Sequence, residues 1–479
     1  MSDRLSPLDV SFLYLEDSTT VMHVGSVLVM MPPEGGLDFD RLLRHINARI
    51  AFVPRYRQRL RWVPGRLANP VWVDDERFDL TYHVRRSALP RPGTVEQLRE
   101  LVARVQSRHL DRRRPLWELY VVEGLEDNRF AIITKTHQAL VDGVNAVDLA
   151  QVVLDDTPTP GRLPGDTWRS RPEPSSVELV TAAVMDAVRR PTQVVDTVRS
   201  GLGDLQVAGE KAIGALGGLA LAARTAARPA PDTPLNVPVG VHRRFGMVAT
   251  DLVDYRRIRA FHARGGRRQG GGAGTPISIN DVVLATVAGA LRAWLLTRRA
   301  RVSPTTVVRA LVPVSVVPEG AEGPVTGLST AVAANLVDLP VGEPNPVLRL
   351  QQVAYQMTAH ADSGRAVGAE QLAGIGGFAP PTLHSLGTRV AGGLSRRLFN
   401  IVVTNSPGPQ QPLYAAGSRM VATYPVIPLA KSNALSIGLT SYDGGVYYGL
   451  NADREAMADV DVVGQCIEDA LAELGETVR

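Results

Sequence analysis

The first third of the chain alternates stretches with the hydrophobic spacing of strands and stretches with that of helices. Residues 25–31 (GSVLVMM) and 129–136 (RFAIITKT) are rich in apolar and β-branched side chains, which predicts strands. Residues 38–50 (DFDRLLRHINARI) and 95–110 (VEQLRELVARVQSRHL) repeat apolar side chains every three or four positions, which predicts amphipathic helices. This alternation predicts a mixed α/β domain over residues 1–165.

The pattern breaks in the middle of the chain, where proline and glycine dominate residues 157–166 (TPTPGRLPGD) and 170–176 (SRPEPSS). Such stretches are typical of linkers. Residues 176–228 then follow a helical pattern built largely from alanine, glycine and valine. This composition fits small-residue packing between domains or a membrane-touching hairpin, and acidic residues on the polar face favour packing. We expect a helical linker over residues 166–239.

Strand and helix patterns resume in the last part of the chain. Residues 279–296 (INDVVLATVAGALRAWLL) predict a helix that lies among several β-rich runs. A second α/β domain is therefore expected over residues 240–479, which makes the fold class α/β with two sandwich domains. The runs that predict its strands are 306–316, 329–339, 397–407, 434–444 and 445–453.

Composition and charge exclude several classes of protein. The 479 residues correspond to two or three domains, and 44% hydrophobic residues are enough to bury sizeable cores. The formal net charge is only +4 and the basic residues are dispersed, so a nucleic-acid partner is not expected. The single cysteine, Cys466, lies in a helical pattern and is expected to be a core residue. No histidine–cysteine cluster has zinc-ligand spacing, so no metal is expected.

The N-terminal sequence MSDRLSPLDVSFL lacks the basic and apolar regions of a signal peptide. No apolar run reaches the roughly 18 residues that a membrane span needs. We therefore expect a cytoplasmic protein, and the sequence leaves peripheral contact with the inner membrane face open.

The clearest chemical motif lies in residues 133–155 (ITKTHQALVDGVNAVDLAQVVLD), where a β-like run ends at His137. Asp142 and Gly143 follow at the start of an amphipathic helix. A histidine at such a loop can act as a general base because its pKa lies near neutral pH. It can equally orient the loop by bonding backbone groups. An Asp-Gly pair before a helix is also an ordinary N-cap and tight turn.

Eight blocks, in order from residue 4 to about residue 460, together resemble the bacterial wax ester synthase/diacylglycerol acyltransferase family. Each block alone is a weak match, whereas their common order and spacing make the resemblance specific. The blocks are the opening LSPLDVSFLYLED with VMHVGS, FDLTYHVRRSALPRPG (78–93), RRPLWELYVVEGL (113–125), INDVVLA (279–285), LVPVSV (311–316), ANLVDLP (334–340), TNSPGP (404–409) and the closing SYDGGVYYGLNAD.

The resemblance implies two related α/β sandwich domains of the kind found in chloramphenicol acetyltransferase and in condensation domains, with a channel between them. It also implies an acyl-CoA-dependent O-acyltransferase that makes triacylglycerol or wax esters. Long-chain acyl-CoA would be the co-substrate, diacylglycerol or a fatty alcohol would be the acceptor, and no bound cofactor would be needed. Lipid substrates further imply contact with a membrane or lipid-droplet surface.

The signature loop of that family, His-His-x-x-x-Asp-Gly, corresponds here to residues 137–143. Its second histidine is the family's general base, and this sequence has Gln138 at that position. Glutamine cannot accept a proton, so the substitution implies weak activity or a catalytically impaired homologue that binds acyl-CoA or lipid. The resemblance assigns the catalytic loop to His137, Gln138, Asp142 and Gly143, with Asp142 as a brace. A third alternative is a condensation-type transferase for polyketide or peptidyl thioesters, although the sequence contains no carrier-protein module.

The resemblance also implies substrate contacts outside this loop, at Asn280, Asp281, Asn405, Ser406 and Trp117. Each of these residues has a simpler explanation as well. Asn280 could cap the following helix, and the Pro-Gly turn beside Asn405 and Ser406 needs no ligand. Trp117, in the Pro-Leu-Trp signature, is better explained as a packing residue.

Residues 263–274 (ARGGRRQGGGAG) form a basic, glycine-rich stretch, and coenzyme A carries phosphates. The stretch lacks the strand–loop–helix context and the spacing of a phosphate-binding loop. A solvated loop is therefore the better explanation.

Overall fold

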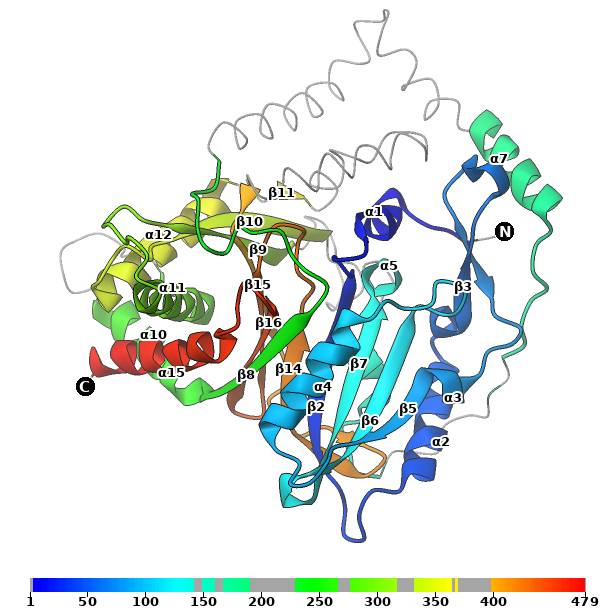
Figure 1. Ribbon diagram of the computed structural model, residues 1–479, viewed down its shortest axis with the longest axis horizontal. Helices are drawn as coiled ribbons and strands as arrows, with labels where there is room; N and C mark the ends of the chain where they lie inside the picture. Colours follow the sequence, from blue (N-terminus) through cyan, green and yellow to red (C-terminus); the bar gives the residue numbers. More distant parts are fainter. Residues whose placement is uncertain are drawn as a thin grey trace, which may run out of the picture.

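The computed structural model of the protein contains two large β-sheets, one of six and one of seven strands. The sheets lie side by side, and helices pack on both (Figure 1). This arrangement confirms the predicted α/β fold with two sandwich-like halves. The residues that the structure describes are 3–141, 149–159, 166, 168–189, 229–265, 276–316, 331–363, 367–368 and 398–478.

The six-stranded sheet is covered on both faces. In sheet order its strands are β13 (Tyr414–Ala415), β14 (Ser418–Val426), β2 (His23–Met31), β7 (Arg129–His137), β6 (Trp117–Leu125) and β5 (Val84–Ala88). Leu28 of β2 packs in one core with helix α2 (Phe39–Ile50), whereas Val27 packs in another with helix α4 (Val95–Ser107). Side chains alternate between the faces of a strand, so a continuous apolar run is what a sheet covered on both faces requires.

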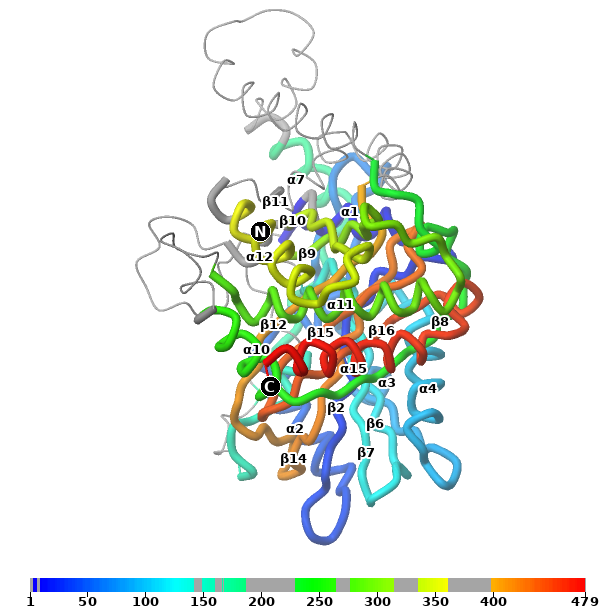
Figure 2. The backbone as a smooth tube through the Cα atoms, turned by 90° about the vertical axis from the view of Figure 1, so that its left-hand side faces the viewer, coloured from blue at the N-terminus to red at the C-terminus, as the bar shows by residue number. Residues whose placement is uncertain are grey.

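The seven-stranded sheet belongs to the C-terminal half of the chain. In sheet order its strands are β11 (Val367–Gly368), β10 (Ala331–Leu339), β9 (Val308–Val316), β12 (Ile401–Pro407), β15 (Leu435–Tyr442), β16 (Gly445–Asp453) and β8 (Arg243–Asp251). β12 is parallel to β9 and β15, and the other neighbours are antiparallel. Helices α15, α11 and α12 are stacked along one side of this sheet (Figure 2). The helices of this half are α10 (Leu252–Gly265), α11 (Ile279–Thr297), α12 (Pro346–Ser363) and α15 (Val460–Glu476).

Helix α11 forms the apolar centre of the second core. Its start is fixed by a capping box, in which Ser278 Oγ accepts a hydrogen bond from the Asp281 N–H (3.1 Å) and Asp281 Oδ2 accepts one from the Ser278 N–H (2.7 Å). Among the described helices, α11 is the one with the length and apolar composition of a membrane span, and 72% of its apolar window is buried inside the protein. Core burial therefore accounts for that composition. Cys466 of α15 lies in the same core, which confirms the prediction for this residue.

The two sheets share chain from both halves of the sequence. β14 comes from the C-terminal half but pairs antiparallel with β2, and Tyr424 lies opposite Val27. Helix α4 packs against β8 through a core that includes Leu98 and Met247. The predicted boundary at residue 240 assigned β14 to the second domain, and the structure instead places it in the first sheet. The six-stranded sheet is therefore completed by residues from the far end of the chain.

Part of the predicted linker is a helix that packs on a small third sheet. Helix α7 (Ser176–Arg189) contributes Leu179 and Ala183 to a core shared with Val71. The small sheet consists of β1 (Asp3–Arg4), β4 (Val71–Asp74) and β3 (Gln58–Arg61). The rest of the alanine-rich helical pattern, from residue 190 to 228, and most of the basic glycine-rich stretch lie outside the described residues.

Short helices surround the end of β7, where the predicted signature loop begins. Helix α5 (Gln138–Val141) follows β7 directly and packs against α1 (Pro7–Leu15). Helix α6 (Leu149–Val153) contacts β2, β7 and α2. The remaining short elements are α3 (Leu80–His83), η1 (Pro54–Arg57), η2 (Pro64–Arg66) and η3 (Glu126–Asn128).

Candidate active site

His137 ends strand β7 and is enclosed by protein. It lies opposite His23 in the pairing of β7 with β2, and its side chain is fully buried. Nδ1 of His137 accepts a hydrogen bond from the Ala139 N–H (3.0 Å), which assigns the ring proton to Nε2. Nε2 faces Glu16 Oε2 at 3.5 Å, an ion-pair distance that is long for a hydrogen bond. Both ring nitrogens are thus directed at protein groups.

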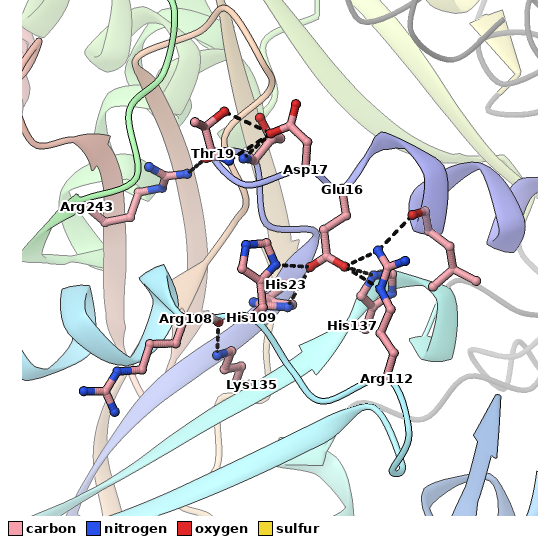
Figure 3. A network of polar contacts seen from close by, with 12 residues as sticks. Glu16, Asp17, Thr19, His23, Arg108, His109, Arg112, Lys135, His137 and Arg243 are labelled. Atoms are coloured by element: carbon pink, nitrogen blue, oxygen red, sulfur yellow. Dashed lines mark hydrogen bonds and ion pairs between the residues drawn. The ribbon is translucent and has the colours of Figure 1, made fainter. Parts of the chain in front are cut away.

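The Glu16 carboxylate is the centre of this site (Figure 3). It follows helix α1 and is almost completely buried. Oε1 lies 3.2 Å from both His23 Nε2 and His109 Nδ1, and Oε2 accepts a hydrogen bond from Arg112 Nε at 3.0 Å. Basic side chains from separate segments therefore converge on one carboxylate. We call Glu16, His23, His109, Arg112 and His137 the Glu16 cluster.

Burial and close partners together fix the charges in the Glu16 cluster. Burial alone would raise the pKa of the Glu16 carboxyl, but His137 and His23 outweigh it, so the pKa lies far below its usual range and the group stays ionised. Burial lowers the pKa of His23 to about 3, although Glu16 opposes this shift, so the ring is neutral near pH 7. Arg112 then supplies the positive charge that balances Glu16.

Further bonds fix the end of β7 from both sides. Lys135 is fully buried, and its Nζ donates to Val105 O (2.9 Å) and to Arg108 O, which ties β7 to the C-terminal end of α4. Burial lowers the pKa of Lys135 to about 8. The His137 N–H donates to Leu116 O at 3.0 Å. The position of His137 is therefore determined by backbone and side-chain contacts before any substrate binds.

Gln138 lies outside the Glu16 cluster although it directly follows His137. It begins helix α5, its N–H donates to Met22 O at 2.9 Å, and its side chain is partly exposed. Because the chain changes from strand to helix here, the two neighbouring side chains have different surroundings. This geometry supports His137 as an orienting residue and leaves Gln138 as the residue of the pair that solvent can reach. Asp142 and Gly143 lie outside the described residues, so their predicted roles stay predictions.

Asn280 and Asn405, two predicted substrate contacts from distant parts of the sequence, meet in the structure. Asn280 lies in the first turn of α11 and Asn405 lies in β12, and Asn405 Nδ2 donates to Asn280 Oδ1 at 3.0 Å. Both residues are partly exposed, and the neighbouring Ser406 is exposed. Within the described ranges, no hydrogen bond or ion pair joins this pair to the Glu16 cluster, so a common channel stays a prediction.

Comparison with known proteins identifies the family. The model of the wax ester synthase/diacylglycerol acyltransferase (WS/DGAT) catalytic domain matches residues 5–265, and that of the WS/DGAT C-terminal domain matches residues 329–475. The chain belongs to the WS/DGAT family. The prediction from the order of the sequence blocks is confirmed.

Several proteins are similar to this WS/DGAT chain over much or all of its length. A probable diacylglycerol O-acyltransferase of Mycobacterium tuberculosis, tgs2, is 33% identical over 99% of both chains. A second protein of that description from the same species, tgs3, is 46% identical over 54% of this chain and 96% of its own. The WS/DGAT structure from Marinobacter aquaeolei VT8 has a TM-score of 0.67 at 28% identity and covers 99% of each chain. The first condensation domain of the CDA synthetase shares the fold alone, with a TM-score of 0.55 and 14% identity over 100% of this chain and 97% of its own.

Two residues predicted to contact substrate in this WS/DGAT protein have packing and capping roles in the structure. Trp117 has no exposed surface, its Nε1 donates to Tyr56 O at 2.7 Å, and its ring stacks on His83 with centroids 4.6 Å apart. A buried indole offers no surface to a substrate, so the packing explanation replaces the predicted contact. Asp281 is 3% exposed and belongs to the capping box of α11, but it also lines a cavity beside Ser278, so its predicted substrate contact stays a prediction.

The sequence did not reveal the partners of His137 in this WS/DGAT site. Glu16 and His23 both lie in the opening block that carried the family resemblance, but their spacing has no periodic meaning. The sequence feature that could have marked His23 as a site residue was its position at the start of an apolar strand. Arg112 joins Glu16 across 96 positions of sequence, and such a contact depends on strand pairing and on the path of the chain.

Proposed function

We propose that this WS/DGAT protein transfers a long-chain acyl group from coenzyme A to the hydroxyl of diacylglycerol or a fatty alcohol, forming triacylglycerol or a wax ester. The observation that carries the proposal is similarity over 99% of both chains to a probable diacylglycerol O-acyltransferase. The buried support around His137 adds to it, because it fixes the start of the signature loop.

The reaction forms one C–O bond and breaks one C–S bond. The acceptor hydroxyl oxygen attacks the thioester carbonyl carbon and gives up its proton, and coenzyme A leaves and finally takes up a proton as the thiol. A neutral alcohol attacks slowly, so both its position and the removal of its proton control the rate. Donors directed at the carbonyl oxygen stabilise the negative charge that develops there.

Gln138 changes the proton-transfer step of this reaction. Its carboxamide can hold the acceptor hydroxyl by a hydrogen bond but cannot take up the proton. His137 is poorly placed to replace it, because Nδ1 is engaged by the Ala139 N–H and Nε2 faces Glu16. We infer that water carries the proton to the departing thiolate. Loss of a general base costs a factor of about 10² to 10⁴ in rate, so we expect weak activity.

The proposal is tested with purified full-length protein and radiolabelled palmitoyl-CoA. The acceptor panel contains a diacylglycerol, a long-chain alcohol and a short-chain alcohol, and a sample without acceptor is the control. We expect labelled triacylglycerol or wax ester to accumulate in proportion to protein, with no requirement for an added cofactor and no effect of EDTA. Binding of palmitoyl-CoA without ester formation from any alcohol would favour the second candidate, an acyl-CoA-binding homologue, which the loss of the base at Gln138 suggests.

We further propose that the protein works in the cytoplasm, at the surface of a membrane or lipid droplet. The support is chemical, because diacylglycerols and fatty alcohols dissolve in such surfaces rather than in water. The apolar helix α11 is buried in the protein core, which fits peripheral contact. In cell fractionation, salt or alkali should release the protein from membranes. Release by detergent alone would contradict peripheral attachment.

A further inference from the structure

A cavity of about 750 Å³ lies between the two halves of the chain, and arginine dominates its lining. Helix α4 forms one wall, and the starts of β8 and α15 form the other. None of the roles assigned so far uses this cavity. Three carboxylates and six arginines line it, and the arginines are Arg99, Arg104, Arg108, Arg243, Arg244 and Arg454.

Three of these arginines carry positive charge without a protein partner. Arg104, Arg108 and Arg454 are exposed, and their guanidinium groups form no hydrogen bond or ion pair with any residue that the structure describes. Arg104 lies in the last turn of α4 and Arg108 is its C-cap residue, so two positive charges gather at this helix end and repel each other. The C-terminal end of a helix favours positive charge, which can account for the unpaired arginines at the end of α4. It cannot account for Arg454, which lies on the opposite wall of the cavity. An anion bound between the walls would remove the repulsion.

The carboxylates of the cavity do not neutralise these three arginines. Asp461 is already held by Arg99 at 3.2 Å and by Arg244 at 3.7 Å. Glu100 precedes Arg104 by four residues on α4, a spacing at which opposite charges attract, so it offsets part of the charge of Arg104. Neither Glu96 nor Glu100 forms an ion pair with an arginine within the described part of the chain. Uncompensated positive charge therefore remains at the C-terminal end of α4.

The walls of the cavity are bonded to the supports of the Glu16 cluster. Arg243 lines the cavity and donates to Thr19 O, in the turn that follows Glu16. The carbonyl of Arg108 accepts a hydrogen bond from Lys135 Nζ of β7. Figure 3 shows the side chain of Arg108 directed away from Glu16, while its backbone lies beside Lys135. The cavity and the supports of the Glu16 cluster are therefore neighbours in the structure.

We propose that this cavity binds the phosphate groups at the nucleotide end of coenzyme A, with the pantetheine arm extending toward Gln138. The inference rests on the proposed function, because it takes acyl-CoA as the substrate. Guanidinium groups form paired hydrogen bonds with phosphate oxygens, and they remain charged at every working pH. Coenzyme A carries a diphosphate and a separate 3′-phosphate, which suits Arg104, Arg108 and Arg454 on two walls better than a single bound phosphate would.

The test measures binding of free coenzyme A to the full-length protein by isothermal titration calorimetry. The variants are Arg104→Ala/Arg108→Ala and Arg454→Ala, and Arg256→Ala at an exposed position of α10 is the matched control. We expect the double variant to weaken binding by about 10- to 100-fold and Arg454→Ala by about 10-fold, because charge-assisted hydrogen bonds are lost. The control should bind like wild type, and all variants should keep the wild-type unfolding midpoint. In turnover assays, the cavity variants should raise KM for palmitoyl-CoA more than they lower kcat.

Two further probes distinguish whether the cavity binds the phosphates of coenzyme A or those of an anionic lipid. Wild type should bind dephospho-coenzyme A more weakly than coenzyme A, and the double variant should lose this difference. Vesicles with phosphatidylglycerol are the second probe. If the cavity variants lost vesicle binding but bound coenzyme A like wild type, the cavity would be a lipid site and the inference would be wrong.

The remaining outcomes distinguish this inference from the proposed function. If wild type makes ester and all arginine variants bind coenzyme A within about twofold of it, only the cavity assignment fails. If wild type neither binds nor turns over acyl-CoA, the proposed function fails together with the inference.

Discussion

His137 Nε2 lies 3.5 Å from Glu16 Oε2, and both side chains are almost completely excluded from solvent. The same carboxylate also meets His23 and Arg112. Its charge is therefore compensated within the protein, which suits a structural support better than a reacting group. We therefore infer that His137 is a positioning residue that fixes the end of β7, and that its partly exposed neighbour Gln138 is the one that an acceptor alcohol can reach.

Replacing Glu16 tests this positioning role. Glu16→Ala leaves Arg112 and three imidazoles without their partner, so we expect the free energy of unfolding to fall by about 2 kcal/mol. This loss is smaller than for a fully buried ion pair, because Arg112 is partly exposed and solvent screens its charge. The displaced loop should also lower kcat by about tenfold or more, with a smaller change in KM. Urea denaturation and initial rates measure both effects.

Two controls make this result interpretable. Glu16→Asp keeps the charge and should recover part of the stability and of kcat. Glu34→Ala, at an exposed position, should match wild type in both measurements. Wild-type stability and kcat in Glu16→Ala would contradict the positioning role.

His23 should make stability depend on pH. Its pKa is about 3 in the folded protein and about 6.5 in the unfolded chain, so the unfolded chain binds this proton first as the pH falls. Stability is therefore lost as the pH falls from about 6.5 toward 3, with a slope that approaches about 1.4 kcal/mol per pH unit from this group. Glu16 affects stability at lower pH than His23 does. Its lowered pKa stabilises the folded protein fully above the unfolded pKa of about 4.5, and this contribution is lost as the pH falls below that value.

Urea unfolding at a series of pH values measures this dependence. The variant His23→Gln removes the titrating group and should flatten the slope between about pH 4 and 6, whatever its effect on absolute stability. An unchanged slope in this variant would show that other groups cause the pH dependence.

The contact between Asn280 and Asn405 should appear as an energetic coupling. A double-mutant cycle with Asn280→Ala, Asn405→Ala and the double variant should give a coupling of about 0.5–1.5 kcal/mol in the free energy of unfolding, because one hydrogen bond is lost in each variant. As a control, a second cycle combines Asn405→Ala with Asn47→Ala, at an exposed position of α2, and the two changes in the free energy of unfolding should be additive. Additivity of Asn280→Ala and Asn405→Ala would contradict the contact. If the pair borders the acceptor site, each single variant also raises KM for the alcohol.

Much of the fold was predictable because its core elements carry continuous or periodic apolar patterns. Residues 25–31 and 129–136 lie in β2 and β7, and residues 279–296 lie in α11. In each case the information lies within a few neighbouring residues. The cap of α11, expected at Asn280, lies instead at Ser278 in the structure.

The site was less predictable because it is assembled from distant segments. Glu16 meets His109 across 93 positions of sequence, and β14 joins β2 from the other end of the chain. No local pattern contains such pairings, since they depend on the packing of whole elements. The resemblance located the loop at His137 and Gln138, but only the structure showed that one of these side chains is buried and the other is partly exposed.

The central claim is that Gln138 occupies the base position of a slow but working acyltransferase site. The most direct measurement compares kcat of wild type and Gln138→His with palmitoyl-CoA and one acceptor across a range of pH, with Gln138→Asn as the control. We predict slow ester formation by wild type and a kcat about 10- to 100-fold higher for Gln138→His, a gain of about 1.4–2.7 kcal/mol in transition-state stabilisation. The gain should follow a titration near pH 6.5, as expected for a histidine base, and Gln138→Asn should show none. If neither wild type nor Gln138→His forms ester from any alcohol while both bind palmitoyl-CoA, the protein is an acyl-CoA-binding homologue and the account is wrong.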